Sequence, residues 1–181
     1  MNIAVYCAAS KSNCPEFAKK TEELGKWMAQ NHHTLVYGGG NTGLMGVVAT
    51  AVMNEGGEVI GVMPQFFVDR EIAKQDITKL HIVDTMSDRK NQMIALSEVF
   101  IALPGGPGTL EEIAEVVSWV RVGQTNGICI FYNMEGYYDH LEAFFDKMVE
   151  TNLLSEDDRS QIHFAKTIAE IEALIEAYKK R

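Results

Sequence analysis

Short apolar runs alternate with stretches of helical periodicity along nearly the whole chain. The apolar runs have the length and composition of strands and lie at residues 2–7, 34–37, 58–63, 80–83, 99–103 and 127–132. The helical stretches between them lie at residues 15–31, 43–55, 88–97, 110–122 and 137–151. Near-continuously apolar strands separated by helices are typical of a parallel sheet covered on both faces. The sequence therefore predicts a doubly wound α/β domain, whose ligands bind outside the carboxyl ends of the strands.

The chain has the length of one such domain. Its 181 residues, of which 46% are hydrophobic and 23% charged, are enough to bury a sizeable core. No repeat, low-complexity tract or linker divides the sequence, so we expect a single domain over residues 1–181. Residues 167–181 carry apolar side chains at helical spacing. We expect a C-terminal helix there, docked on the body of the domain or, alternatively, exposed for a partner.

Charge and composition limit the partners of the chain. The formal net charge of −9 argues against polymeric nucleic acid, which normally requires a basic face, but it leaves a small anionic ligand open. No apolar run approaches the roughly 18 uncharged residues of a membrane helix, and the first residues lack the basic region of a signal peptide. The three cysteines, an odd number, favour a reduced, cytoplasmic setting.

Residues 104–112 read PGGPGTLEE and join an apolar strand to a helical pattern. A strand, a glycine-rich turn and a helix start bring backbone N–H groups and the positive end of the helix dipole to one point, which attracts phosphate. Glu111 and Glu112 follow in the predicted first turn, and a carboxylate beside a phosphate site points to chemistry on a nucleotide or sugar phosphate. The structural alternative is that Thr109 caps the helix and Glu112 completes a capping box.

A second glycine cluster, GGGNTG, occupies residues 38–43. It satisfies the dinucleotide pattern G-x-G-x-x-G, but it follows the second strand and no acidic residue ends the next strand about 20 positions later, which argues against NAD. Four glycines in six positions suggest that a ligand approaches the backbone, so Gly39 and Gly40 are candidate binding residues. Close packing of a helix on a strand is the alternative explanation.

Two basic residues, Arg89 and Lys90, begin a helix predicted between the two glycine clusters, with Ser87 as its N-cap. Basic side chains at a helix start oppose the helix dipole, and a bound phosphate would relieve this. The next strand brings residues 104–112 to the same edge of the sheet, which favours a functional Arg89 over a solvated surface pair. Ser10 follows the first strand at that edge and is a further candidate.

Together these segments resemble the LONELY GUY family. The resemblance is carried by GGGNTGLMG at 38–46, DRK at 88–90 and PGGPGTLEE at 104–112, and it extends from the first strand to about residue 150. The family, formerly labelled lysine decarboxylase-like, comprises cytokinin riboside 5′-monophosphate phosphoribohydrolases. The resemblance implies a Rossmann-like homodimer that hydrolyses the N-glycosidic bond of a nucleoside 5′-monophosphate, AMP or an N6-modified form, to free base and ribose 5-phosphate.

Motif matching assigns roles to individual residues. The family's catalytic arginine and glutamate fall on Arg89 and Glu112. Its phosphate-binding and other ligand-binding positions fall on Gly105, Gly106, Gly108, Thr109, Lys90, Glu71 and Ser118. Cleavage of a glycosidic bond develops positive charge on the sugar, and a carboxylate such as Glu112 can stabilise it and orient or deprotonate the attacking water. Because arginine is a very weak acid, we expect Arg89 to act through charge and hydrogen bonds.

Two other functions remain open at the level of the sequence. Related Rossmann-like proteins carry nucleotides or the molybdenum cofactor without turnover, although the presence of both Arg89 and Glu112 favours an enzyme. A pyridoxal-phosphate decarboxylase would need a Schiff-base lysine and a partner for the pyridine nitrogen, and neither is identifiable. The five histidines have no convincing metal-ligand spacing. We therefore expect no metal and no organic cofactor.

Overall fold

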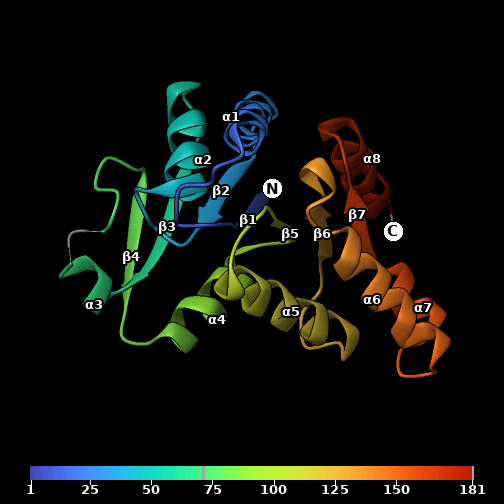
Figure 1. Ribbon diagram of the computed structural model, residues 1–181. Helices are drawn as coiled ribbons and strands as arrows, with labels where there is room; N and C mark the ends of the chain where they lie inside the picture. The colour runs from blue at the N-terminus through green and yellow to red at the C-terminus, as the bar shows by residue number, and fades with distance from the viewer. Residues whose placement is uncertain (71, 181) are drawn as a thin grey trace.

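The described residues form one seven-stranded parallel sheet between two layers of helices (Figure 1). The computed structural model describes residues 1–70 and 72–180. The strand order is β4-β3-β2-β1-β5-β6-β7, and every neighbouring pair is parallel. The doubly wound α/β fold predicted from the alternating pattern is thus confirmed.

The elements follow one another as strand and helix along most of the chain. The strands are β1 (Asn2–Tyr6), β2 (Thr34–Tyr37), β3 (Val59–Pro64), β4 (Lys79–Val83), β5 (Val99–Ala102), β6 (Ile128–Tyr132) and β7 (Ile162–Ala165). The helices are α1 (Pro15–Gln30), α2 (Gly43–Asn54), α3 (Gln65–Val68), α4 (Met86–Leu96), α5 (Pro107–Arg121), α6 (Asp139–Glu150), α7 (Glu156–Ser160) and α8 (Ile168–Lys179), with a short 3-10 turn η1 (Met134–Gly136) before α6.

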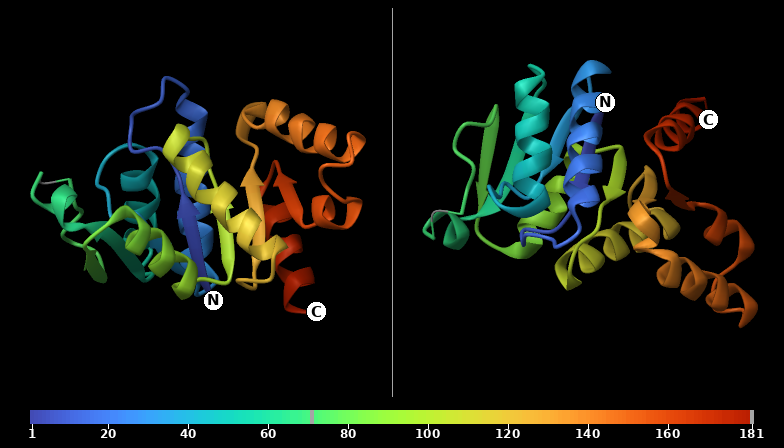
Figure 2. Two further views of the ribbon diagram at one scale, coloured as in Figure 1. Left: turned by 90° about the horizontal axis from the view of Figure 1, so that it is seen from below. Right: turned by 45° about the horizontal axis from the view of Figure 1, so that its top comes forward.

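Strand β1 is buried on both faces because helices cover both sides of the sheet. Ile3 and Val5 belong to a core under α1, α2 and α8, whereas Ala4 and Tyr6 belong to a core under α4, α5 and α6. The two helical layers are seen on opposite sides of the sheet in Figures 1 and 2. Burial on both faces explains why the strand is apolar at every position after Asn2.

The chain reverses its direction across the sheet between β1 and β5. From β1 it proceeds through β2 and β3 to β4 at one edge, and α4 then returns it to β5 on the other side of β1. The loops that leave β1 and β5 therefore diverge from a common point. One hydrogen bond links the two loops at that point: the N–H of Ala8, after β1, donates to the carbonyl of Pro104, after β5, at 3.3 Å. Ligands of doubly wound sheets bind at such a point.

Several short elements were not predicted from the sequence. The strand β7 has only four residues, lies at the edge of the sheet and includes His163, so it lacks a continuous apolar run. The helices α3 and α7 have four and five residues, too short for a helical period to be visible.

At the C-terminal end, α8 packs Ile171 and Ile175 into the core. No helix in the described part of the chain is long and apolar enough to cross a membrane.

Candidate active site

A cavity of about 450 Å³ opens at the strand switch point. It lies beyond the carboxyl ends of β1, β2 and β3 and against the first turns of α2, α4 and α5. The residues that line it are Cys7, Ala8, Ala9, Ser10, Gly38, Gly40, Met45, Met63, Phe67, Ile72, Met86, Arg89, Gly106, Gly108, Thr109, Glu111 and Glu112. Most of them are apolar or small, with a few charged and polar groups, as in sites for small organic ligands.

A buried ion pair lies in the wall of this cavity. The Nη1 of Arg89, on α4, donates to Oε1 of Glu112, on α5, at 2.7 Å. The Nε of Arg89 donates to the carbonyl of Val62, on β3, at 3.2 Å. The side chains of Arg89 and Glu112 are only 7% and 5% exposed. Two charges are kept from water in this way only when they pair closely, and the carbonyl of Val62 fixes the plane of the guanidinium.

The helix that carries Arg89 begins with a capping box. The Oγ1 of Thr85 accepts from the N–H of Asp88 at 3.1 Å, and a carboxylate oxygen of Asp88 accepts from the N–H of Thr85 at 3.1 Å. Ser87 is therefore inside the helix, and its prediction as the N-cap is wrong. With Thr85 as the cap, Arg89 lies one turn into the helix, where its side chain points back toward β3.

The helix that carries Glu112 begins earlier than predicted. It starts at Pro107, with Gly106 as its N-cap and no side-chain cap. Proline is favoured at the first helical position because its missing N–H has no partner there in any case. Glu111 and Glu112 thus lie beyond the first turn, and the capping-box interpretation of Thr109 is wrong. The N–H groups of Gly108 and Thr109 now belong to the first turn, where the helix supplies no acceptor for them.

Burial governs the protonation of the groups around the cavity. It raises the pKa of the Glu112 carboxyl above its ordinary value, and the neighbouring Arg89 guanidinium acts in the opposite direction. Burial also raises the pKa of the Cys7 thiol well above its usual range. Cys7 is therefore a neutral thiol near pH 7, not a thiolate nucleophile. Glu112 is thus a buried carboxyl group with a raised pKa in the wall of the cavity.

Packing within the protein explains two glycines of the first cluster, Gly38 and Gly43. A Cβ on Gly38 would lie 1.9 Å from Nη2 of Arg89, so this glycine makes room for the guanidinium. Gly43 has a φ of +60°, and a Cβ there would lie 2.5 Å from the backbone of Ala9. The N–H groups of Leu44 and Met45 donate to the carbonyl of Ala8 at 2.9 and 3.3 Å. The helix end that the dinucleotide pattern would offer to a pyrophosphate is thus occupied by the chain's own backbone.

Gly106 and Gly108 differ from these glycines. A Cβ at either position would meet nothing within 4 Å apart from the adjacent residues and the backbone of its own helix. Neither has a positive φ, so neither packing nor backbone conformation requires glycine there. Both nevertheless line the cavity, at the positive end of α5. A ligand that approaches this backbone closely would account for the absence of a side chain at both positions.

The structure brings most of the predicted site residues to one cavity. Arg89, Glu112, Gly106, Gly108, Thr109, Glu111, Gly40 and Ser10 line it. Gly105 lies just behind the lining, where a Cβ would be 2.1 Å from Oγ1 of Thr109. Gly39 faces Met63 instead of the cavity. Glu71 lies outside the described residues.

Two further predicted residues lie away from the cavity lining. Lys90 pairs with Glu111 and, at 3.0 Å, with Glu115, and these hydrogen bonds raise the pKa of Lys90. Ser118 is exposed on α5. The described lining contains no lysine that could form a pyridoxal-phosphate Schiff base. In residues 1–70 and 72–180, no group of three or more histidine, cysteine or acidic side chains could hold a metal ion.

Sequence reasoning missed the apolar wall of the cavity. It is made by Met45, Met63, Phe67, Ile72 and Met86. These residues come from the starts of α2 and α4, from the end of β3 and from the connection between β3 and β4. The connection is held in place because the N–H of Asn41 donates to the carbonyl of Ile72 at 3.1 Å. An isolated methionine or phenylalanine in a sequence is indistinguishable from a core residue, so no local pattern marks this wall.

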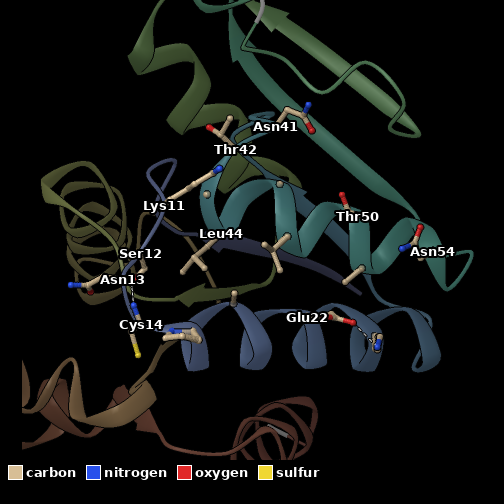
Figure 3. A pocket seen from close by; sticks show the side chains of 17 residues that line it. Lys11, Ser12, Asn13, Cys14, Glu22, Asn41, Thr42, Leu44, Thr50 and Asn54 are labelled. Carbon is tan, nitrogen blue, oxygen red and sulfur yellow. Dashed lines mark hydrogen bonds and ion pairs between the residues drawn. The ribbon is translucent and has the colours of Figure 1, made fainter.

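A larger groove of about 730 Å³ runs between α1 and α2 (Figure 3). Figure 3 shows Lys11 reaching over the first turn of α2 toward Thr42, with Glu22 of α1 on the other side of the groove. Its lining includes neither Arg89 nor Glu112. The loop after β1 separates the two spaces, since Ala8 to Ser10 line the smaller cavity and Lys11 to Cys14 line the groove. The ion pair and the open glycines identify the smaller cavity as the candidate active site.

Comparison with known proteins gives close relatives of this chain. A family model described as "Possible lysine decarboxylase" matches residues 45–175. A cytokinin riboside 5′-monophosphate phosphoribohydrolase of Arabidopsis thaliana is 40% identical over 179 residues, which are 99% of this chain and 84% of the relative. An enzyme of the same name from Oryza sativa subsp. japonica is 38% identical over 176 residues, which are 97% of this chain and 73% of the relative.

Solved structures share the fold at lower identity. The molybdenum cofactor carrier protein of Chlamydomonas rheinhardtii has a TM-score of 0.73 at 21% identity, and the match covers 99% of this chain and 98% of the other. The molybdenum cofactor binding protein of Rippkaea orientalis has a TM-score of 0.69 at 20% identity over 97% and 95% of the two chains. At such identities the likeness concerns the fold alone. The plant relatives and the family model show that this chain belongs to the LONELY GUY family.

Proposed function

We propose that this protein hydrolyses the N-glycosidic bond of a nucleoside 5′-monophosphate and releases a free base and ribose 5-phosphate. The names of the plant relatives support this reaction. The observation that carries it in the structure is one cavity that combines a buried Arg89–Glu112 pair with two glycines, Gly106 and Gly108, that packing does not require. AMP and its N6-modified forms are the proposed substrates.

The 5′-phosphate binds at the start of α5 in this proposal. The N–H groups of Gly106, Gly108 and Thr109 are available there, and the helix dipole adds a partial positive charge. The missing side chains of Gly106 and Gly108 let phosphate oxygens come within hydrogen-bond distance of the backbone. The overall negative charge of the protein does not oppose this, because these local donors act at contact distance.

The ribose lies next to Glu112. As the bond to the base breaks, positive charge develops on the sugar ring. An ionised carboxylate within the cavity stabilises that charge and orients, or takes a proton from, the attacking water. The electron pair of the broken bond leaves with the base, the water oxygen bonds to the sugar carbon, and the proton that the water loses ends on the base. Glu112 is largely withdrawn from solvent, so its charge acts strongly on the sugar. It needs no metal or organic cofactor for this role.

Arg89 keeps the carboxylate of Glu112 ionised and in place. Burial alone favours the protonated acid, and the guanidinium offsets this effect. A guanidinium is too weak an acid to give up its own proton to the departing base. Arg89 therefore acts as a fixed positive charge and hydrogen-bond donor toward Glu112 and the substrate.

The apolar wall receives the base. It includes Met63 and Phe67, from β3 and α3, whereas the phosphate site follows β5. Strands β2 and β1 lie between β3 and β5, so β3 and β5 are three strand spacings apart. At about 4.8 Å per spacing, the distance between them is roughly 14 Å. This span suits an extended nucleotide with its phosphate on α5 and its base on the apolar wall.

We also propose that the protein acts as a homodimer in the cytoplasm. Exposed apolar side chains near the mouth of the cavity support self-association, because Met86 and Leu110 are 37% and 45% exposed at the starts of α4 and α5. The free thiols of Cys7, Cys14 and Cys129 are consistent with a reducing compartment. Sedimentation of the purified chain measures the assembly directly.

The proposed reaction is tested by incubating the purified protein with a panel of nucleoside 5′-monophosphates and measuring free base by chromatography. We expect adenine, or an N6-modified adenine, to be released together with an equal amount of ribose 5-phosphate. Tight binding of AMP without any release of base would contradict the hydrolase and favour a carrier of nucleotides.

A further inference from the structure

Two adjacent tyrosines contact the glycine-rich loop from outside the cavity. The hydroxyl of Tyr137 donates to the carbonyl of Gly105 at 2.6 Å, and the hydroxyl of Tyr138 donates to the carbonyl of Leu103 at 2.6 Å. Both tyrosines follow β6, the neighbour of β5 in the sheet. Neither lines the cavity. These two hydrogen bonds join the connection after β6 to the proposed phosphate-binding loop after β5.

The connection after β6 holds the tyrosines firmly. The side chain of Asn133 accepts from the N–H of Tyr138 and donates to Asp139, both at 2.7 Å. The ring of Tyr138 packs edge-on against Phe131 with centroids 5.2 Å apart. The ring of Tyr137 packs in the same way on Phe17 of α1, at 5.6 Å. Both hydroxyls are thus donated from fixed positions.

Four successive carbonyls of the loop have a hydrogen-bond donor. Tyr138 binds the carbonyl of residue 103, the N–H of Ala8 binds that of residue 104, Tyr137 binds that of residue 105, and the N–H of Leu110 binds that of residue 106. A loop with two neighbouring glycines has unusual freedom to rotate its peptide planes. The external donors remove this freedom.

The bond from Tyr137 determines where one N–H group points. In a trans peptide, the C=O of one residue and the N–H of the next point in opposite directions. Because the carbonyl of Gly105 is turned toward Tyr137, the N–H of Gly106 is turned away from it, on the side where Gly106 lines the cavity. The other tyrosine cannot act in this way, since residue 104 is a proline and has no N–H.

We propose that Tyr137 is a positioning residue for the 5′-phosphate, which fixes the Gly105–Gly106 peptide so that the N–H of Gly106 faces the bound phosphate. This inference rests on the proposed function, because it takes the phosphate to bind at this loop. Tyr137 touches the loop only and takes no part in the chemistry at Glu112. It therefore affects the affinity for the phosphate and leaves the breaking of the glycosidic bond unchanged.

The test compares the double variant Tyr137→Phe with Glu112→Gln against the single variant Glu112→Gln, the parent protein here. The Glu112→Gln change keeps AMP from being consumed during the measurement. The affinities for AMP and for adenosine, which lacks the phosphate, are measured by calorimetry. Loss of one neutral hydrogen bond corresponds to about a fivefold weaker affinity for AMP, and we expect no change for adenosine. Tyr178→Phe, on the distant helix α8, is the matched control and leaves both affinities unchanged.

A role in stability alone would not change the ratio of the two affinities. Tyr137 is 45% exposed and Tyr137→Phe keeps the ring on Phe17, so the variant is expected to fold. In ¹⁵N spectra, the shift of the Gly106 amide on addition of AMP becomes smaller in this variant. An unchanged preference for AMP over adenosine would overturn this inference alone. A parent protein that binds AMP no better than adenosine would overturn the phosphate site and the proposed function as well.

Discussion

Arg89 and Glu112 meet at 2.7 Å although 23 positions separate them in the sequence and each belongs to a different helix. Helices α4 and α5 lie side by side on one face of the sheet, and each directs one charged side chain to the carboxyl edge of the strands. The pair is nearly closed to water, so each charge depends on the other.

Replacing Arg89 by methionine leaves a buried carboxylate without its partner. We expect Arg89→Met to lower the free energy of unfolding by about 3–5 kcal/mol at pH 8. The pKa of Glu112 would rise further above its unfolded value, so the loss is full at high pH and becomes smaller as the pH falls and the carboxyl is protonated. Urea unfolding at pH 8 and pH 5 measures this.

The double variant Arg89→Met with Glu112→Gln is the control for this prediction. It removes the buried charge, and we expect it to recover most of the lost stability at pH 8 while it remains inactive. Equal losses in the single and double variants would contradict a buried charge as the cause.

Gly38 gives Arg89 its space. The Cβ of Gly38→Ala would lie 1.9 Å from Nη2 of Arg89, so the guanidinium must move away from its position beside Glu112. Displacement of a catalytic group by about 1 Å can reduce the rate about 100-fold. We expect kcat/KM for AMP to fall by about that factor, with a stability loss of about 1–3 kcal/mol. Steady-state kinetics measures this. If Gly38→Ala had the kcat/KM of the wild type, the activity would not depend on the exact position of the Arg89 guanidinium.

Gly108 tests the phosphate site without disturbing the fold. A Cβ at this position meets nothing within 4 Å apart from the adjacent residues and the backbone of its own helix, and alanine is a better helix former than glycine. We expect Gly108→Ala to be as stable as the wild type or more stable by up to about 1 kcal/mol. The KM for AMP should rise at least about tenfold, because the methyl group occupies the space of a phosphate oxygen. A stable variant with an unchanged KM would place the phosphate elsewhere.

His33 makes the stability of the protein sensitive to acid. Burial, the charge of the N-terminus and Lys179 lower the pKa of His33 to about 4. Because the unfolded histidine titrates near 6.5, the stability from neutral His33 is complete above that pH and is lost as the pH falls toward 4. The loss between pH 7.5 and pH 5 is about 2 kcal/mol.

The variant His33→Gln measures this contribution. We expect it to lack this part of the acid sensitivity in denaturant unfolding across pH 5–7.5. His140→Gln, at an exposed histidine, is the matched control and keeps the wild-type pH dependence. If the free energy of unfolding of His33→Gln and of the wild type changed equally with pH, this would contradict the view that His33 is buried as a neutral imidazole.

The sequence predicts the sheet well because its central strands are buried on both faces. Continuous apolar runs such as β5 and β6 are visible without any structure. The edge strand β7 is missed because its four residues, IHFA, form neither a continuous apolar run nor a long alternation. The same limit applies to α3 and α7, whose lengths fall below two helical turns.

The site could be predicted in part. The positions of Arg89 and Glu112 at one edge follow from the order of strands and helices, but the exact helix starts do not. Thr109 is a better N-cap than Gly106 by side-chain chemistry, yet Pro107 begins the helix because its fixed φ suits the first helical position. The apolar wall and Tyr137 could not be predicted, since their roles depend on contacts between segments far apart in the chain.

The most direct test of the central claim is the release of base from AMP by Glu112→Gln. The wild type should release adenine and ribose 5-phosphate in equal amounts. Without an ionised carboxylate beside the sugar, we expect the rate to fall on the order of 1,000-fold, while the affinity for AMP changes less than about threefold. Release of adenine by Glu112→Gln at the wild-type rate would contradict the account of this site.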